Sequence, residues 1–464
     1  MPQNEGKKYD VIIVGSGSAG IFAARELALK GGLKVLLVDK GDTLERRRCP
    51  NRQSGQGCIE CPRCAILCGW GGAGAYSDGK LNLTSLVGGY LNEYIEEDAL
   101  QGLIAYVDGI YLAHGAPRQV FGHDEKKTGA LKAQAEAAGM ELLTYPIRHL
   151  GTENCSLVLK GLYRELSERV TIRFRTEVRE VIVEEGRAAG VRLSDGEEVR
   201  AGTVIIAVGR EGSSWLSEES LRLGLRQRIN PVDIGVRVEV PATVTDAVTD
   251  VLFESKLIYR TRYFSDAVRT FCMCPHGEVV RENYNGLFTV NGHSFRKTRT
   301  ENTNFALLVQ MTFTEPFSQP ITYGKRIAEL ANLLGDGIIV QRLGDLKRGR
   351  RSTPERISQG AVVPTLCDTT PGDLSLVLPY RFLTNLLEML ETLDWLMPGV
   401  DSPHTLLYGV EVKFYSMRLE LTPGLETKIA SLYTVGDGAG VSRGLVQASC
   451  SGVVAARDIM AKHH

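Results

Sequence analysis

Runs of apolar residues between glycine turns dominate the first forty residues of the chain. Residues 11–14 are consecutive apolar side chains, which is typical of a strand buried on both faces of a parallel sheet. Residues 21–30 have the character of a helix, and residues 34–38 form a second strand-like run that ends at Asp39. The pattern therefore predicts a strand, a crossover helix and a second strand parallel to the first.

Beyond this start the pattern divides into two parts. Before residue 230, helices alternate with strands. The expected strands are residues 141–147, 170–174, 178–184 and 188–193 and a run from 203, and the expected helices are residues 92–138, broken at 114–117, and 155–168. After residue 230, short strand-like runs recur at 233–240, 251–257, 270–273, 279–281, 287–290 and 305–312. In 233–240 apolar residues alternate with charged or small ones, which predicts a half-exposed strand.

The last hundred residues return towards the first pattern. Helices are expected there at residues 382–396 and 444–460 and a buried strand at 432–435, and another helix is expected earlier, at 323–334. We therefore expect an α/β fold: a Rossmann-like domain, a parallel sheet with helices and a three-stranded insert, formed by residues 1–230 and 425–464. A mainly antiparallel α+β substrate or cap domain is expected to be inserted at 231–424.

The turn after the first strand carries the first chemical signal. Gly15, Gly17 and Gly20 give the spacing GxGxxG, and Asp39 follows about 20 residues later. The first glycine allows a tight turn, the second lets backbone approach a pyrophosphate, and the third lets the helix pack closely on the strand. The helix N-terminus offers N–H groups to that pyrophosphate. Strand, glycines, helix and acid in this order predict a dinucleotide site.

Composition sets limits on partners and compartment. The formal net charge of −1 gives no overall field that favours nucleic acid or an anionic membrane. No uninterrupted apolar stretch approaches the ~18 residues of a spanning helix, and no apolar core of a secretory signal precedes the first strand. We expect a cytoplasmic protein without nucleic-acid partners, and the sequence does not set its oligomeric state.

Five of the ten cysteines crowd between Cys49 and Cys68. Cys58, Cys61, Cys64 and Cys68 have the spacing C-x2-C-x2-C-x3-C, which resembles the run of bacterial iron–sulfur ferredoxins except that Gly69 replaces proline. Thiolates with this spacing predict a metal site, either an iron–sulfur cluster or Zn²⁺. Two alternatives stay open: a redox dithiol formed by Cys61 and Cys64, and reduced, metal-free thiols.

Glycine and basic residues flank this cluster. Four glycines between residues 69 and 74, followed by Ser77, Asp78 and Lys80, suit backbone lying close against a flat ligand, with a plain surface loop as the alternative. Residues 46–48 are three arginines, for which a solvated loop is favoured over contact with cofactor phosphates. The basic residues of 347–351 receive the same interpretation, with an anionic substrate pocket as the alternative.

Three motifs together resemble the glutathione-reductase-like FAD flavoproteins. GSGSAG with Asp39 is similar to their ADP-binding start, IIAVGR to their middle signature, and YTVGDGAG to their C-terminal GD motif. A closer likeness, to a bacterial family of FAD-dependent dehydrogenases, is carried by GGAGAYSDGKL, NPVDIGVRVE, GVEVKFYS and VGDGAGVSRGLVQAS. Asp39 departs from the glutamate that is more frequent in these flavoproteins.

The resemblance implies FAD as cofactor, makes residues 1–230 and 425–464 the FAD-binding domain, and assigns roles to particular residues. The expected contacts to the ADP half are Gly15, Gly17, Ser18, Ala19, Gly20, Asp39 and Lys40, with Val178 near the adenine and Ala207 and Gly209 beneath the dinucleotide. Gly436, Asp437 and Gly444 are expected at the ribityl phosphate. Gly72, Ala73 and Gly74, with Lys80, are expected to line the isoalloxazine.

The chemistry that this implies is hydride transfer at flavin N5 to or from a small-molecule substrate. Lys80 is the expected catalytic group, stabilising negative charge on the reduced ring, and His149, His293, Tyr408 and Tyr415 are candidate acids or bases. Since no second GxGxxG appears between Gly209 and Asp437, electrons are expected from the substrate, from transiently bound NAD(P)H, or through the cysteine cluster from an electron-transfer partner. The alternatives are a flavin monooxygenase, an iron–sulfur-linked electron-transfer flavoprotein, and a non-enzymatic FAD-bound structural or RNA-modification partner.

Overall fold

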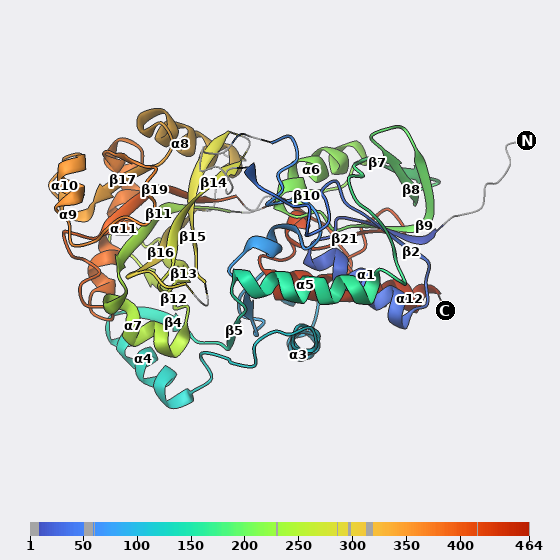
Figure 1. Cartoon of the computed structure of the whole chain (residues 1–464), viewed down its shortest axis with the longest axis horizontal. Coiled ribbons are helices and arrows are strands. Elements are labelled where there is room, and N and C mark those ends of the chain that lie inside the picture. The colour runs from blue at the N-terminus through green and yellow to red at the C-terminus, as the bar shows by residue number, and fades with distance from the viewer. Residues whose placement is uncertain are drawn as a thin grey trace, which may run out of the picture. The chain divides into compact units, whose positions relative to one another are not determined.

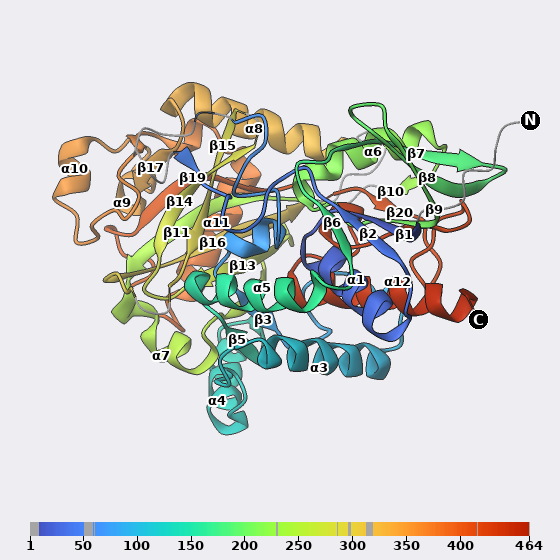
Figure 2. The ribbon, with the colours of Figure 1, turned by 45° about the vertical axis from the view of Figure 1, so that its right-hand side comes forward.

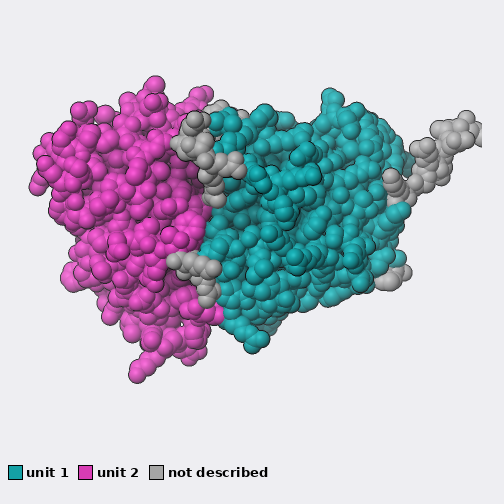
Figure 3. Space-filling model, in the orientation of Figure 1, with its two compact units in different colours: residues 1–118, 148–230, 415–464 teal, residues 119–147, 231–414 magenta. Residues whose placement is uncertain are grey.

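A computed structural model describes residues 9–50, 59, 61–228, 231–284, 286–295, 298–311, 319–414 and 416–463. The chain divides into two compact units, coloured separately in Figure 3. Unit 1 comprises residues 1–118, 148–230 and 415–464, and unit 2 comprises residues 119–147 and 231–414. The predicted boundaries differ at two places: residues 119–147 belong to unit 2, and unit 1 resumes at 415 instead of 425. None of the described helices is long and apolar enough to cross a bilayer.

Unit 1 is built on a parallel sheet. Its strands run in the order β6 (Thr171–Arg173), β2 (Val35–Val38), β1 (Tyr9–Val14), β9 (Glu198–Ile206) and β21 (Leu432–Thr434), all parallel to their neighbours. The first half of β9 also continues an antiparallel meander with β8 (Arg187–Leu193) and β7 (Val178–Glu184). This is the expected Rossmann-like sheet with its three-stranded insert.

Helices and short elements complete unit 1. Helix α1 (Ser18–Lys30) packs beside α12 (Leu445–His463) from the other end of the chain, as Figures 1 and 2 both show. Other helices in the described part of unit 1 are α3 (Glu97–Ala113), α5 (Thr152–Leu166) and α6 (Ser213–Arg222), with 3₁₀ turns η1 (Gly72–Tyr76), η2 (Leu91–Glu93), η3 (Arg210–Gly212) and η5 (Asp437–Ala439). Small strands are β3 (Lys80–Asn82), β10 (Gln227–Arg228) and β20 (Arg418–Leu419), and β5 (Ile147–His149) lies where the chain passes from unit 2 to unit 1.

Unit 2 is built on an eight-stranded, largely antiparallel sheet. Its strands run in the order β18 (Thr370–Pro371), β17 (Ile339–Arg342), β19 (Leu406–Lys413), β11 (Val232–Pro241), β16 (Asn302–Met311), β13 (Ala267–Cys274), β12 (Lys256–Arg260) and β4 (Met140–Leu143). The hairpin of β14 (Glu278–Tyr284) and β15 (Leu287–His293) forms a separate two-stranded sheet. The helices in the described part of this unit are α4 (Glu125–Ala137), α7 (Ala242–Leu252), α8 (Pro320–Gly335), α9 (Leu343–Leu346), α10 (Pro354–Ser358) and α11 (Tyr380–Leu393), with the 3₁₀ turn η4 (Leu374–Leu376). The predicted fold class is thus confirmed.

Strand β11 corrects one expectation. Its alternating sequence predicted a half-exposed strand, but residues 232–240 are all buried. The charged positions are tolerated because neighbouring strands supply partners: Arg237 donates to Asn304 at 2.8 and 2.7 Å and lies 3.4 Å from Glu411, which also pairs with Lys413 at 2.9 Å. Buried charges of this kind need such partners to remain in a core.

Candidate functional site

The predicted cofactor residues converge at one edge of the unit 1 sheet. Strands β1, β2, β9 and β21 are parallel neighbours, so their carboxyl ends share an edge. The four strands end at residues 14, 38, 206 and 434, and the predicted residues 15–17, 39, 207–209 and 436–437 come within three residues of these ends. Ligands of open α/β sheets bind outside the carboxyl ends of the strands, and the arrangement therefore defines a single candidate site.

The glycines of the fingerprint fall into two groups. A Cβ on Gly15 would lie 2.6 Å from the Ala207 carbonyl oxygen, and a Cβ on Gly20 would lie 1.9 Å from the Gly15 oxygen. Both positions are therefore required by packing. Around Gly17 no atom lies within 4 Å of an added Cβ, and no side chain caps α1 there. Open backbone at the N-terminus of α1 is the cradle that a pyrophosphate requires, and Ser18 and Ala19 form its first turn.

Asp39 is engaged by protein donors on both carboxylate oxygens. One oxygen accepts from the Ser16 amide and hydroxyl at 2.8 and 2.7 Å, and the other from the amides of Gly41 and Gly69 at 2.7 and 2.9 Å. A carboxylate offers about four lone-pair positions, so a ribose hydroxyl would have to share one of them. Asp39 thus joins the fingerprint turn to the segment that carries Gly69.

Lys40, the neighbouring predicted contact, forms an ion pair with Glu211 at 2.7 Å. Cys68 lies close to both groups. Burial, followed by the charge of Glu211, raises the pKa of the Cys68 thiol to about 12. Without a metal ion or another cation, this thiol is therefore neutral at physiological pH and a poor nucleophile.

The glycine-rich loop packs against the fingerprint. The Gly71 amide donates to the Ser16 carbonyl at 2.8 Å, and a Cβ on Gly72 would lie 3.1 Å from the Gly17 Cα. A Cβ on Gly74 would lie 3.6 Å from the Ser18 hydroxyl, and Ala73 lies between these two glycines in η1. The loop that was expected to line the cofactor is thus brought to the same edge of the sheet.

The C-terminal motif supplies a second carboxylate at this edge. Asp437 accepts from the Ser442 hydroxyl at 2.6 Å, and the Arg210 guanidinium lies 3.9 Å from its other oxygen. The Gly436 amide donates to Ser451 of α12 at 3.0 Å, which ties the motif to that helix. Added Cβ atoms at Gly209 and Gly444 would meet nothing within 4 Å, so the backbone is open at both positions.

Two other predicted residues take clear positions in unit 1. Val178 begins β7 and is buried in the hydrophobic core. The Lys80 ammonium lies 3.0 Å from an Asp78 carboxylate oxygen, so its charge is held by a neighbouring acid.

The predicted metal ligands are described only in part. Cys58 lies outside the described residues, so the four-cysteine set stays a prediction. Cys61 and Cys64 are half-buried free thiols, and Cys68 is a buried one. Among the described residues, the sulfur atoms of these three do not come within 4.8 Å of one another as a group.

Of the candidate acids and bases, His149 belongs to unit 1 and both His293 and Tyr408 belong to unit 2. His149 is buried, and His293 ends β15. Tyr408 donates to Glu239, and burial together with that carboxylate raises the pKa of Tyr408 well above its usual value, so it stays protonated at neutral pH. Tyr415 lies outside the described residues.

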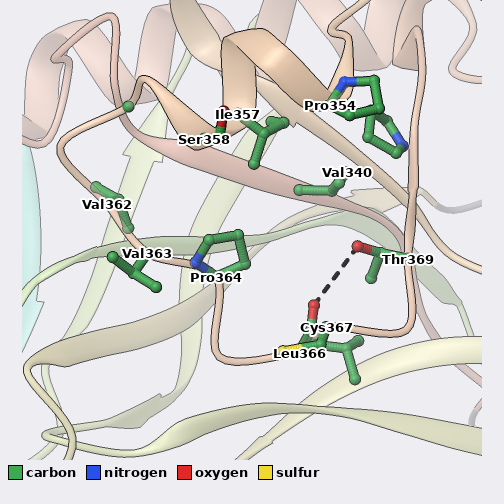
Figure 4. Close-up of a pocket in the computed structure, with 12 residues that line it drawn as sticks. Val340, Pro354, Ile357, Ser358, Val362, Val363, Pro364, Leu366, Cys367 and Thr369 are labelled. Carbon is green, nitrogen blue, oxygen red and sulfur yellow. Dashed lines mark hydrogen bonds between the residues drawn. The ribbon is translucent and has the colours of Figure 1, made fainter.

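Unit 2 has a cavity of about 570 Å³ between α10, β17 and the loop at 360–371 (Figure 4). Val340, Ile357, Val362 and Leu366 give it apolar walls, and Cys367 lies at its margin. None of the residues predicted for the cofactor or the metal lines it.

Arg47 corrects the interpretation of the arginine run. Arg46 and Arg48 are exposed as expected, but Arg47 is buried and donates to main-chain carbonyls within residues 65–72. Ser16 was also missed, although its hydroxyl binds Asp39. A run of three arginines gives no sign of which one turns inward, whereas the position of Ser16 between two fingerprint glycines could have indicated its role.

Comparison with known proteins agrees with this geometry. Residues 10–63 match the family model of an FAD binding domain, and residues 231–414 match that of an FAD-dependent protein, C-terminal domain-like. The chain is therefore similar to an FAD binding domain in its first part and to the C-terminal domain of an FAD-dependent protein over residues 231–414. An uncharacterized protein of Clostridium beijerinckii is 25% identical over 97% of this chain and 80% of its own length.

Three enzymes are among the solved structures to which the chain is similar. A glycerol-3-phosphate dehydrogenase from Bacillus halodurans, complexed with FAD, has a TM-score of 0.40 at 11% identity over 99% of this chain, which spans 65% of the length of that enzyme. L-proline dehydrogenase from P. horikoshii has a TM-score of 0.38 at 12% identity over 97% of this chain and 93% of its own. Glycine oxidase from Bacillus cereus has a TM-score of 0.38 at 14% identity over 98% of this chain and 96% of its own.

Proposed function

We propose that the protein is an FAD-dependent oxidoreductase that moves a hydride between flavin N5 and a small-molecule substrate. The observation that carries this proposal is the open backbone at Gly17, at the N-terminus of α1, on the sheet edge where Asp39 and Asp437 also lie. The match of residues 10–63 to an FAD binding domain supports it. We assign the FAD-binding residues to unit 1 and the substrate-binding residues to residues 231–414.

Particular residues then have particular tasks. The amides at Gly17, Ser18 and Ala19 would bind the pyrophosphate, the Gly72–Gly74 backbone would lie against the ring, and Asp437 with Gly436 and Gly444 would hold the ribityl phosphate end. Asp39 would orient Ser16 and Gly69. Its carboxylate would also accept a hydrogen bond from a ribose hydroxyl, at a position that one of these donors already uses. FAD, when bound, supplies the two-electron redox chemistry.

Lys80 is the proposed electrostatic group. Its ion pair with Asp78 keeps the ammonium in one place, so it can stabilise negative charge without reorganising during the reaction. In the Lys80→Met variant, the midpoint potential of bound FAD should fall, because the reduced, anionic form loses a cation. An unchanged potential would remove Lys80 from the mechanism.

The first experiment is a titration of the FAD-free protein with FAD, followed by flavin fluorescence. The Gly17→Ala variant should bind FAD at least about tenfold more weakly, since its methyl group occupies the space needed by the pyrophosphate. Gly17 has an extended backbone with φ of −75°, so the apoprotein should keep its stability. The matched control is Gly102→Ala, another position at which an added Cβ meets nothing within 4 Å.

Equal affinity of the two variants, or a wild-type protein that fails to bind FAD, would contradict the proposal. With FAD bound, oxygen uptake coupled to hydroxylation of a substrate would favour a monooxygenase instead of a dehydrogenase. A flavin that dithionite does not reduce would favour a structural role for the cofactor.

A further inference from the structure

The residues from 61 to 76, here called the cysteine–glycine segment, are organised around the side chain of Arg47. Its Nε donates to the Ala65 carbonyl at 2.9 Å, and one terminal nitrogen donates to the Trp70 carbonyl at 2.6 Å. The other terminal nitrogen donates to the Ile66 and Gly72 carbonyls at 2.7 and 2.8 Å. The residue is only 4% exposed. One guanidinium thus binds carbonyls on both sides of the turn at Cys68 and Gly69.

A tyrosine from the same segment completes the contact. The Arg47 guanidinium lies 4.9 Å from the centre of the Tyr76 ring, and the Tyr76 hydroxyl donates to the Arg47 carbonyl at 2.6 Å. The cation on the ring face and the hydroxyl on the main chain hold Arg47 from two directions. Both the side chain and the backbone of Arg47 are therefore fixed by this segment.

The chemistry of the contact requires an arginine. Four carbonyl oxygens that point at one place repel each other, and buried carbonyls without donors destabilise a fold. Guanidinium offers five N–H donors in a plane and remains cationic at neutral pH. Lysine offers three donors from a single atom and cannot reach the same set of acceptors.

The segment held by Arg47 is also the segment that touches the fingerprint. Gly72, whose carbonyl binds Arg47, packs on Gly17, and the Gly71 amide donates to Ser16. Asp39 holds the same segment through the Gly69 amide at 2.9 Å. A buried cation and a buried carboxylate thus fix the cysteine–glycine segment against the turn at residues 15–17.

We propose that Arg47 is the organising cation of the cysteine–glycine segment and, through Gly72, a positioning residue for the FAD site. The second part of this inference rests on the proposed function. If Arg47 is the organising cation, the fold of residues 64–76 depends on its guanidinium and needs no bound ion. A metal ion held by the cysteines is the competing organiser, and the test distinguishes the two.

The test compares three adjacent arginines by hydrogen exchange and mass spectrometry on the full-length, FAD-free protein. Arg47→Met should raise the exchange rate of amides in residues 64–72 by at least about tenfold, because the carbonyls of the turn lose their donors. Arg46→Met and Arg48→Met are the matched controls, since both side chains are exposed, and they should stay within about twofold of wild type. Wild-type protein is also measured after treatment with EDTA and 1,10-phenanthroline, and should keep its protection.

Two milder variants show whether faster exchange is confined to residues 64–72 or reflects unfolding of the whole protein. Arg47→Lys and Tyr76→Phe should show intermediate exchange in residues 64–72, while amides of β1 keep wild-type protection. Unchanged exchange in Arg47→Met, equal effects at all three arginines, or loss of protection on chelation would overturn the inference.

Titration with FAD separates this inference from the proposed function. Arg47→Met should bind FAD at least about tenfold more weakly than Arg46→Met. If Arg47→Met loosens the segment and binds FAD with wild-type affinity, the positioning role is wrong. If wild-type protein does not bind FAD, the proposed function fails, and the exchange data still decide whether Arg47 organises the segment.

Discussion

Single atoms decide the role of each glycine at the carboxyl edge of the unit 1 sheet. At Gly15, Gly20 and Gly438 an added Cβ would meet backbone oxygens at 2.6, 1.9 and 1.9 Å. At Gly17, Gly209 and Gly444 it would meet nothing within 4 Å. Glycines of the first group let helices and strands approach, and those of the second group leave backbone accessible to a ligand.

Gly20 and Gly17 should therefore respond differently to the same substitution. Gly20→Ala should lower the free energy of unfolding of the FAD-free protein by about 1–3 kcal/mol, because α1 must move away from the Gly15 carbonyl. Gly17→Ala should leave it unchanged. Urea unfolding followed by circular dichroism measures both variants. Equal stability of the two would contradict the division of roles.

Sequence could predict the residues at this edge better than their partners. The GxGxxG spacing, the acid after β2 and the GD motif predicted which side chains come together. That Asp39 binds the Gly69 amide was not predictable, because the path of the chain across the intervening 30 residues follows from tertiary contacts. The inward position of Arg47 was hidden for the same reason.

Secondary-structure elements of unit 2 are joined by charged side chains as well as by apolar packing. Asp266, just before β13, accepts from two nitrogens of Arg381 at 2.6 Å each and from Asn385 at 2.7 Å. Both partners lie on α11. The hydrogen bonds from Arg381 lower the pKa of Asp266, against the opposing effect of burial. The ionised carboxylate therefore ties the loop before β13 to α11.

This arrangement predicts a pH-dependent contribution to stability. A carboxylate with a lowered pKa in the folded state stabilises the fold at pH values above its unfolded pKa, and this contribution is lost as the pH falls through the folded pKa. Asp266→Asn should thus lower the free energy of unfolding by about 1–3 kcal/mol at pH 7, with a smaller difference below about pH 4.

Urea unfolding at neutral and acid pH measures this effect. The control is Asp250→Asn at an exposed position at the end of α7, which should change stability little at either pH. A difference between Asp266→Asn and wild type that stays constant with pH would show that the carboxylate charge has no part in it.

At the scale of the whole molecule, both units are assembled from separated parts of the chain. Residues 119–147 interrupt unit 1 and contribute α4 and β4 to unit 2, where β4 pairs with β12. The helical and strand patterns of this stretch were visible in the sequence. Its membership of unit 2 was not, because an amphipathic pattern shows which face is buried and leaves open which core covers it.

Substitution of Leu142 in the intact chain tests whether residues 119–147 belong to the core of unit 2. It is 2% exposed, lies opposite Leu257 and belongs to the core of unit 2. Leu142→Ala should cost about 2–5 kcal/mol of stability and accelerate hydrogen exchange in β12 more than in β1. The control Glu141→Ala changes an exposed neighbour on the same strand and should affect neither strand. Faster exchange confined to β1 would place the segment in the core of unit 1.

The pairing of β21 with β9 has a consequence for synthesis on the ribosome. Residues 432–434 complete the parallel sheet beside residues 204–206, and α12 then covers α1. All residues of unit 2 are translated before β21 emerges, so unit 2 can fold while β9 still lacks its neighbour β21 in the unit 1 sheet. The sheet edge that carries Gly15, Asp39 and Asp437 is therefore completed only after residues 432–437 have been translated, and a nascent chain that stops before residue 432 lacks both β21 and Asp437.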